Sequence, residues 1–210
     1  MKSILIGDRR VGRDQPCLVI AEAGVNHNGN LKTAKELISC ARASGAHCVK
    51  FQTFKADQLV LLDAPKAEYQ LKVTDRSETQ YDMLKRLELK QTDYEELIGH
   101  CVKEGIQFLS TPYNIEDVDL LADLGVDAYK LASIHAAEPS FVQYVAKKGK
   151  PIILSTGMAT LSEIDQVVRA VYESGNCDLI LLQCTTNYPS TTEDANIRAM
   201  RTLQETFGLT

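Results

Sequence analysis

The sequence predicts an α/β fold of the barrel type, and three observations support that prediction. Short apolar runs of strand length alternate with amphipathic stretches of helix length, which is the pattern of βαβ units and a parallel sheet. Polar residues follow each apolar run, at the strand ends where parallel barrels gather their functional groups. Glycine follows many of the helical stretches, where it can end a helix in the left-handed conformation: Gly45, Gly105, Gly125, Gly149 and Gly175.

The elements can be placed in chain order. We expect an N-terminal β-hairpin with strands at residues 4–6 and from residue 11 onward, joined by a turn at residues 7–8. Residues 55–90 are too long for a simple connection, so they either fold over the strand ends with some helix of their own or form a surface excursion. About six strand–helix pairs follow the hairpin: 18–23 with 31–44, 48–52 with 92–104, 107–110 with 115–124, 128–131 with 138–148, 151–154 with 161–174, and 179–183 with 197–207.

Composition limits the function classes. The chain has 210 residues, which suits one domain, and we expect a single domain over residues 1–210. Its formal net charge of -5 argues against a nucleic-acid partner, because a surface that binds phosphates needs an excess of Lys and Arg. No apolar stretch approaches the roughly 20 residues that span a bilayer, so we expect no membrane partner and a cytoplasmic location.

The cysteines form no CxxC pair, which argues against a zinc site and against a disulfide framework. They lie instead in segments that resemble strands and helices. Because a free cysteine behaves mainly as a small hydrophobic residue, we expect reduced, buried thiols. The residues concerned are Cys17, Cys40, Cys48, Cys101, Cys177 and Cys184.

Two lysines are the first candidates for function. Lys50 and Lys130 follow apolar strand residues, so we expect their side chains to point into a shared interior. A buried ammonium group is costly unless an anion neutralises it, and that anion is either a phosphate or carboxylate ligand or a protein carboxylate such as Glu22. Hydroxyl groups that could complete a donor shell are those of Thr111, Ser133, Ser155 and Thr156, and Gly157 would let a ligand approach the backbone closely.

Glu22 is the sharpest single candidate. It lies inside the apolar run that leads into the turn Asn26-His27-Asn28-Gly29, and a carboxylate in such a run must be paired. It therefore either forms a salt bridge with one of the lysines or orients a polar substrate, and we favour the substrate. The turn has residues that suit unusual backbone angles, which is a weak functional signal by itself.

Six blocks, read in order, resemble one family across nearly the whole chain. They are IAEAGVNHNG, VKFQT, LSTPY, YKLAS, ILSTGM and LLQCTTNYP, and together they are similar to the N-terminal barrel of the sialic acid synthases, which include N-acetylneuraminate, legionaminate and pseudaminate synthases. The resemblance implies a TIM (β/α)8-type barrel, truncated here after about six βα units. It also implies an enzyme that condenses phosphoenolpyruvate with an N-acylated aminosugar such as N-acetylmannosamine. The product is a nine-carbon 2-keto acid, and phosphate is released.

The resemblance also implies roles for particular residues. Glu22, Gln52 and Tyr188 fall where the family lines its sugar and metal pocket and are the implied catalytic residues. The family polarises the sugar aldehyde with a divalent metal, Mn or Mg, whose histidine ligands are expected beyond residue 210. Thr186 stands where many members have Asn, so either Thr186 or Asn187 would make that contact. Residues implied to hold phosphoenolpyruvate are Lys50, Thr111, Lys130, Ser133, Ser155 and Thr186.

The chain departs from the family pattern, and other functions stay open. His135 stands where members usually have a carboxylate after the Lys-x-x-Ser block. The family's antifreeze-like C-terminal domain, through which a homodimer is implied, is not in this sequence. One alternative is a Schiff-base aldolase that uses Lys130, because a desolvated lysine at a strand end can attack a keto acid. Another is a truncated, non-catalytic barrel that binds the sugar or phosphoenolpyruvate without turnover.

Overall fold

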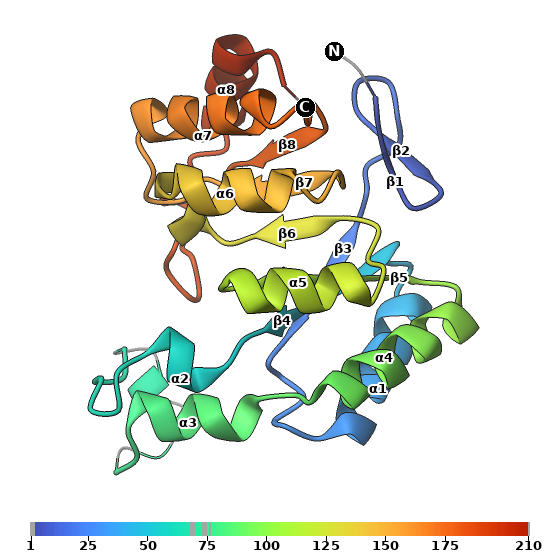
Figure 1. Cartoon of the computed structure of the whole chain (residues 1–210), viewed down its shortest axis with the longest axis vertical. Coiled ribbons are helices and arrows are strands. Elements are labelled where there is room, and N and C mark those ends of the chain that lie inside the picture. Colours follow the sequence, from blue (N-terminus) through green and yellow to red (C-terminus); the bar gives the residue numbers. More distant parts are fainter. Residues whose placement is uncertain (1–2, 68–69, 73–74, 76, 210) are drawn as a thin grey trace. The chain divides into compact units, whose positions relative to one another are not determined.

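The structure is a computed structural model, which describes residues 3–67, 70–72, 75 and 77–209 (Figure 1). Its residue contacts divide the chain into two units, which are described separately. The central unit is Val19–Leu124, and the terminal unit is Met1–Leu18 together with Gly125–Thr210. The expected single domain over residues 1–210 stays a prediction.

A three-stranded parallel sheet forms the core of the central unit. Its strands are β3 (Ile20–Gly24), β4 (Cys48–Thr53) and β5 (Gln107–Pro112), with β4 in the middle. β4 is buried along almost its whole length, as a strand with neighbours on both edges should be. The register places Glu22 opposite Lys50. The predicted site residues of this unit therefore come together through strand pairing.

The central unit also contains the helices α1 (Leu31–Ala43), α4 (Gln91–Glu104) and α5 (Ile115–Asp123). α1 buries Ala34, Ile38 and Ala41, which lie on one face because they recur at helical spacing. Its N-cap is Asn30, whose side chain accepts the backbone N–H of Thr33 at 3.1 Å. α1 and α4 pack against each other (Figure 1).

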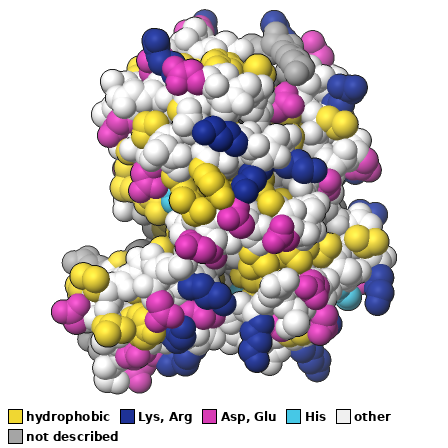
Figure 2. Space-filling model, viewed as in Figure 1, with side chains coloured by type: hydrophobic (Ala, Val, Ile, Leu, Met, Phe, Trp, Pro, Cys, Tyr) yellow, Lys and Arg dark blue, Asp and Glu magenta, His cyan; other side chains and the backbone are white. Residues whose placement is uncertain are grey.

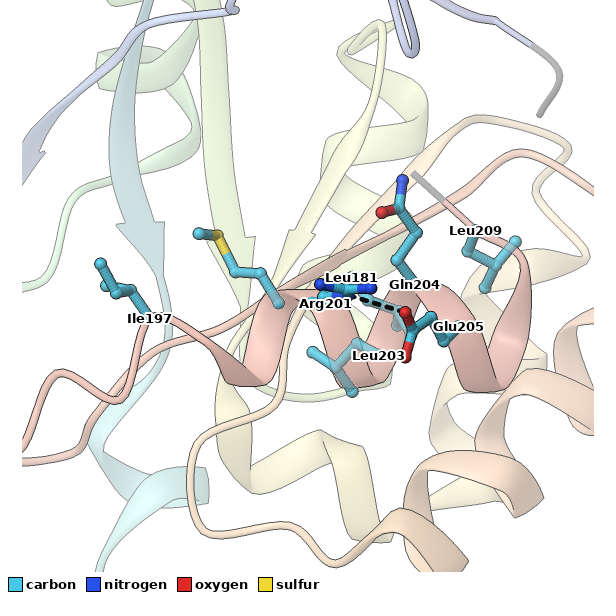
Figure 3. A pocket seen from close by; sticks show the side chains of 8 residues that line it. Leu181, Ile197, Arg201, Leu203, Gln204, Glu205 and Leu209 are labelled. Carbon is cyan, nitrogen blue, oxygen red and sulfur yellow. Dashed lines mark hydrogen bonds and ion pairs between the residues drawn. The ribbon is translucent and has the colours of Figure 1, made fainter.

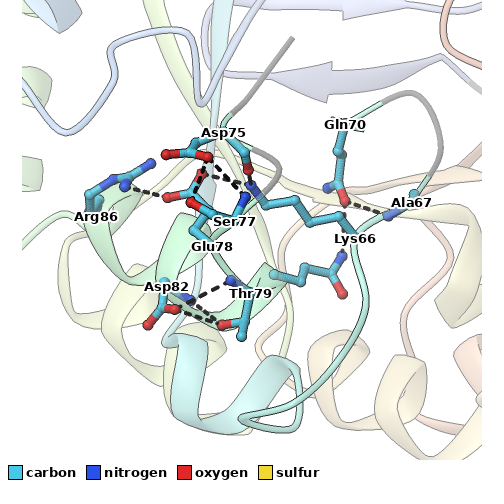
Figure 4. A network of polar contacts seen from close by, with 10 residues as sticks. Lys66, Ala67, Gln70, Asp75, Ser77, Glu78, Thr79, Asp82 and Arg86 are labelled. Atoms are coloured by element: carbon cyan, nitrogen blue, oxygen red, sulfur yellow. Dashed lines mark hydrogen bonds and ion pairs between the residues drawn. The ribbon is translucent and has the colours of Figure 1, made fainter. Parts of the chain in front are cut away.

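The excursion between β4 and α4 has helices of its own, as one of the sequence alternatives expected. They are α2 (Ala56–Leu59), the 3-10 helix η1 (Gln70–Lys72) and α3 (Gln80–Leu87). Figure 4 shows the polar network inside it: the buried Lys66 ammonium lies 2.7 Å from a Glu78 carboxylate oxygen, and Arg86 pairs with the same carboxylate. The excursion also closes on its own ends, because Glu88 accepts the backbone N–H of Ala56 at 2.7 Å. Its expected place over the strand ends stays a prediction.

The terminal unit has a second three-stranded parallel sheet, with β6 (Tyr129–Leu131), β7 (Ile152–Ser155) and β8 (Leu179–Leu182) in that order. Its other elements are the antiparallel hairpin of β1 (Ile4–Ile6) and β2 (Arg9–Val11), the 3-10 helix η2 (Ser133–Ala137), and helices α6 (Pro139–Ala146), α7 (Leu161–Glu173) and α8 (Ala199–Phe207). α6 and α7 pack against each other, and α7 contributes a buried face of aliphatic side chains. The apolar strands are thus covered by helices, as parallel strands require.

The α/β class with parallel sheets is confirmed, and the expected strands and helices are found within about two residues of their predicted ends. All five glycines expected to end helices have positive φ. Two expectations were wrong. The second hairpin strand begins at Arg9 and not at Val11, because the two-residue turn pairs Arg9 directly with Ile6. The thiols are not uniformly buried: Cys48 and Cys101 are buried and Cys184 is half-buried, whereas Cys17, Cys40 and Cys177 are exposed.

The surface agrees with the composition. On the face shown in Figure 2, basic and acidic side chains are interspersed, without a broad basic area. Among the described residues, no helix is both long enough and apolar enough to cross a membrane.

Gly29 provides a test of how closely α3 of the excursion packs against the turn before α1. A Cβ atom on Gly29 would lie 2.2 Å from the backbone oxygen of Arg86 in α3, so we expect Gly29→Ala to displace α3. Gly45 is the matched control, because it also has positive φ but has no atom within 4 Å of such a Cβ. We expect Gly45→Ala to cost roughly 1–2 kcal/mol of unfolding free energy from backbone strain alone. Gly29→Ala should cost clearly more in urea unfolding. An equal loss of unfolding free energy in the two variants would contradict the close packing of α3 against Gly29.

Candidate functional site

Lys50 is the centre of the polar group in the central unit. Its side chain is 11% exposed, and its Nζ lies 2.6 Å from Oε2 of Glu22. It also donates to Oγ1 of the buried Thr111 at 3.4 Å. The carboxylate and the hydroxyl together offset the cost of burying an ammonium group. Glu22, Lys50, Gln52 and Thr111 are called the central half-site below.

The ion pair with Lys50 tests the two alternatives for Glu22, a salt bridge or a contact with substrate. The Glu22 side chain is 54% exposed, so its carboxylate keeps one side open to solvent while it neutralises Lys50. The salt-bridge alternative is therefore confirmed. A role in orienting a substrate stays a prediction, and the exposed side of the carboxylate is where such a contact would be made.

Gly24 shapes the central half-site and was missed by sequence reasoning. The pairing of β3 with β4 shifts register between Glu22 and Gly24, and Gly24 has φ +53. A Cβ on Gly24 would lie 2.9 Å from Oε1 of Glu22 and 3.9 Å from Nε2 of Gln52. The missing side chain thus leaves room for the Glu22 carboxylate. The glycine that directly follows Ala-Glu-Ala in the sequence was the available signal.

Lys130 is the centre of the polar group in the terminal unit. It is 8% exposed, and its Nζ donates to Oγ of Ser155 at 2.5 Å and to the backbone oxygen of Leu131 at 2.7 Å. Ser133 lies at the start of η2 and accepts the backbone N–H of Gly157 at 3.1 Å. The carboxyl ends of β6 and β7 therefore carry one ammonium and two hydroxyls. Lys130, Ser133 and Ser155 are called the terminal half-site below.

The family follows from comparison with known proteins. Residues 37–210 match the model of the NeuB family. The chain belongs to the NeuB family. Over 194 residues it is 46% identical to an N,N'-diacetyllegionaminic acid synthase of Campylobacter jejuni, in an alignment that covers 91% of this chain and 58% of the relative. Over 199 residues it is 33% identical to the N-acetylneuraminate-9-phosphate synthase of Homo sapiens, covering 95% and 55% respectively. The NeuB chain thus spans less than two thirds of the length of these relatives.

Solved structures agree with this NeuB assignment. An N-acetylneuraminic acid synthetase of Leptospira borgpetersenii, solved with citrate, matches with a TM-score of 0.85 at 28% identity, covering 99% of this chain and 68% of that one. A spore coat polysaccharide biosynthesis protein of Bacillus subtilis matches with a TM-score of 0.83 at 29% identity, covering 99% and 55%. The resemblance to the sialic acid synthases is therefore confirmed as a family relationship.

Thr186 and Tyr188 lie in the segment between β8 and α8 of this NeuB chain. Both are exposed, Tyr188 to 68%. Their predicted contacts with a ligand stay predictions. The same holds for the convergence of the central and terminal half-sites, each of which is formed within one unit.

The histidines do not supply a metal site. His135 is buried, lies 2.8 Å through Nδ1 from Oε2 of Glu138, and stacks on Phe141 with ring centroids 4.1 Å apart. His27 is buried beside Phe51, accepts the N–H of Gly29 at 3.0 Å, and has its pKa lowered by burial. Among residues 3–67, 70–72, 75 and 77–209, no group of three or more His, Cys, Asp or Glu side chains could hold a metal ion. The described residues therefore do not fit a metal by themselves.

An apolar hollow of about 610 Å³ lies along α8 (Figure 3). Arg201 and Glu205 both line the hollow and form an ion pair, with Nε of Arg201 2.7 Å from Oε1 of Glu205. None of the predicted site residues lines it. The other lining residues are Leu181, Ile197, Met200, Leu203, Gln204 and Leu209.

Asp117 is a buried carboxyl in the first turn of α5. Burial raises the pKa of its carboxyl to about 6 from an ordinary 3.8, although it also accepts the backbone N–H groups of Tyr113 and Asn114. A raised pKa means that the folded state binds the proton more tightly. Its stabilisation is therefore complete below about pH 4 and is lost as the pH rises through about 6, a change of up to about 3 kcal/mol.

We expect Asp117→Asn to remove that fall in unfolding free energy between about pH 4 and about pH 6. Urea unfolding of the wild type and the variant across this range measures the difference. Asp123→Asn, an exposed position at the end of the same helix, is the control and should leave the fall in place. Parallel pH profiles for the wild type and Asp117→Asn would show that this carboxyl is already ionised at low pH.

Proposed function

We propose that this chain is the phosphoenolpyruvate-binding part of a sialic-acid-type synthase, folded as a TIM (β/α)8-type barrel. The full reaction would condense phosphoenolpyruvate with an N-acylated hexosamine to give a nine-carbon 2-keto sugar acid and phosphate. Family membership supports this proposal, as do the relatives, which are legionaminic, pseudaminic and N-acetylneuraminate-9-phosphate synthases.

One observation supports it most. Each parallel sheet places a buried lysine near its carboxyl edge, and each lysine has a hydroxyl partner from the neighbouring strand: Thr111 for Lys50 and Ser155 for Lys130. Phosphoenolpyruvate has two anionic groups, a phosphate and a carboxylate. Two ammonium groups with hydroxyl donors suit a ligand that has two separate anionic groups.

The chemistry that these residues would support is electrostatic. In the proposed reaction the enol carbon of phosphoenolpyruvate forms a bond to the aldehyde carbon of the sugar, water adds at C2, and the phosphate leaves. Lys50 and Lys130 would hold and neutralise the anionic groups while charge shifts toward the phosphate. Glu22, whose carboxylate is exposed on one side, would accept a hydrogen bond from a sugar hydroxyl or hold a proton near the reacting aldehyde.

The family also implies a divalent metal, Mn or Mg, which would polarise the sugar aldehyde when bound. The described residues do not fit a metal by themselves, so no step assigned to this chain's residues depends on one. The proposal that histidines beyond residue 210 supply the ligands, and the proposal of a homodimer, rest on the resemblance alone.

A Schiff-base aldolase is less well supported by the contacts of Lys130. Its Nζ donates to two oxygens, which is how an ammonium group is held, whereas a nucleophilic lysine needs a neutral amine with a free lone pair. Treatment with borohydride in the presence of pyruvate separates the two chemistries. We expect no covalent adduct at Lys130, and a trapped adduct there would favour the aldolase.

A calorimetric titration with phosphoenolpyruvate in the presence of manganese tests the proposed function. We expect saturable binding by the wild type and binding weaker by about tenfold or more for Lys50→Met and for Lys130→Met, because each loses a charged donor. Lys103→Met, at an exposed position on α4, is the control and should bind like the wild type. A folded wild-type chain that does not bind, or lysine variants that bind equally well, would contradict the proposal.

A further inference from the structure

The backbone N–H of Gly157, just after β7, is shared between two side chains. It lies 3.1 Å from Oγ of Ser133 and 3.3 Å from Sγ of Cys184. The two side-chain atoms are themselves 3.1 Å apart. Three segments of the terminal unit, those after β6, β7 and β8, thus meet in one polar cluster at the carboxyl ends of their strands.

Cys184 differs from the other cysteines in its surroundings. Cys48 and Cys101 are buried, and Cys17, Cys40 and Cys177 are exposed. Cys184 is half-buried, and its sulfur contacts a hydroxyl and an amide. Its sulfur therefore lies among polar groups of the loops that follow the strands.

The hydrogen bonds decide what the Ser133 hydroxyl can still do. Its oxygen accepts the Gly157 N–H, so its own proton must point elsewhere. The Cys184 thiol lies 3.1 Å from that oxygen, and it can either donate to the second lone pair of the oxygen or accept the Ser133 proton. When the thiol donates, the Ser133 proton stays available for another acceptor.

The loop that carries Gly157 is held tightly. Thr156 makes two bonds of 3.0 Å to the backbone oxygen of Leu182, one through its N–H and one through its hydroxyl. Met158 has φ 66, which is uncommon for a residue with a long side chain, and is 71% exposed. The backbone strain at Met158 persists only where surrounding contacts hold the backbone in place. Gly157 is part of those contacts, because a Cβ there would lie only 3.0–3.1 Å from atoms of Ser133 and Cys184.

We propose that Cys184 is a positioning residue for the proposed phosphoenolpyruvate site. Its sulfur holds the Gly157 amide and the Ser133 hydroxyl, so that Ser133 can donate to an anion that Lys130 and Ser155 also bind. The inference rests on the proposed function and adds a residue that neither the motif pattern nor the lysine geometry indicates.

Two substitutions test the role of the sulfur. We expect Cys184→Ser to bind phosphoenolpyruvate within about twofold of the wild type, because a hydroxyl can accept the same hydrogen bonds, and Cys184→Ala to bind about fivefold to tenfold more weakly. Cys177→Ala, at an exposed cysteine, is the control and should bind normally. Thermal unfolding of all three shows that the variants are folded. An alanine variant that binds like the wild type, or a serine variant as weak as the alanine variant, would overturn the proposal.

Alkylation by iodoacetamide gives a second readout. With saturating phosphoenolpyruvate we expect the alkylation of Cys184 to slow by about fivefold or more, since the ligand would contact the adjacent Ser133. The exposed Cys17, Cys40 and Cys177 serve as internal references and should react at unchanged rates. Equal Cys184 rates with and without a ligand that demonstrably binds would overturn this inference alone. A wild-type chain that binds no phosphoenolpyruvate would overturn both this inference and the proposed function.

Discussion

The ammonium group of Lys50 is buried near the carboxyl end of β4, and the polar arrangement of the central unit depends on how that charge is compensated. An isolated ammonium group in such a place would cost several kcal/mol. Glu22 compensates for it at 2.6 Å and Thr111 adds a longer hydrogen bond. The Lys130 ammonium group, which is also buried, donates to a hydroxyl and to a backbone oxygen. A bound anion would add a charged partner at Lys130, whereas at Lys50 it would share the ammonium group with Glu22.

Strand pairing makes this compensation possible. The parallel register sets Glu22 opposite Lys50. It also sets Lys130 opposite Ile153, which lies two residues before Ser155 in β7. The shift after Glu22 and the positive φ of Gly24 then leave space for the carboxylate. In the terminal unit the loop after β7 is bound to the end of β8 and to Ser133. Local backbone geometry therefore decides where each charged or hydroxyl group can point.

Much of this could be predicted from the sequence, and the exceptions have physical reasons. The alternation of apolar runs with amphipathic stretches located the strands and helices, because both periodicities are local. That Lys50 and Lys130 have polar partners could be predicted because a charge inside an apolar run needs one. The contacts of Gly24 and Cys184 could not, since each depends on segments that are distant in sequence or on one backbone angle. The exposure of Cys40 was missed because a thiol suits either face of α1.

The proposal that Lys50 and Lys130 each bind an anionic group of phosphoenolpyruvate is the central claim, and diffraction from crystals of this chain grown with phosphoenolpyruvate tests it most directly. The expected result is bound phosphoenolpyruvate whose anionic groups contact Lys50 and Lys130, with Ser133 and Ser155 donating to it. Density for bound phosphoenolpyruvate that leaves either lysine without a contact to an anionic group would contradict the claim.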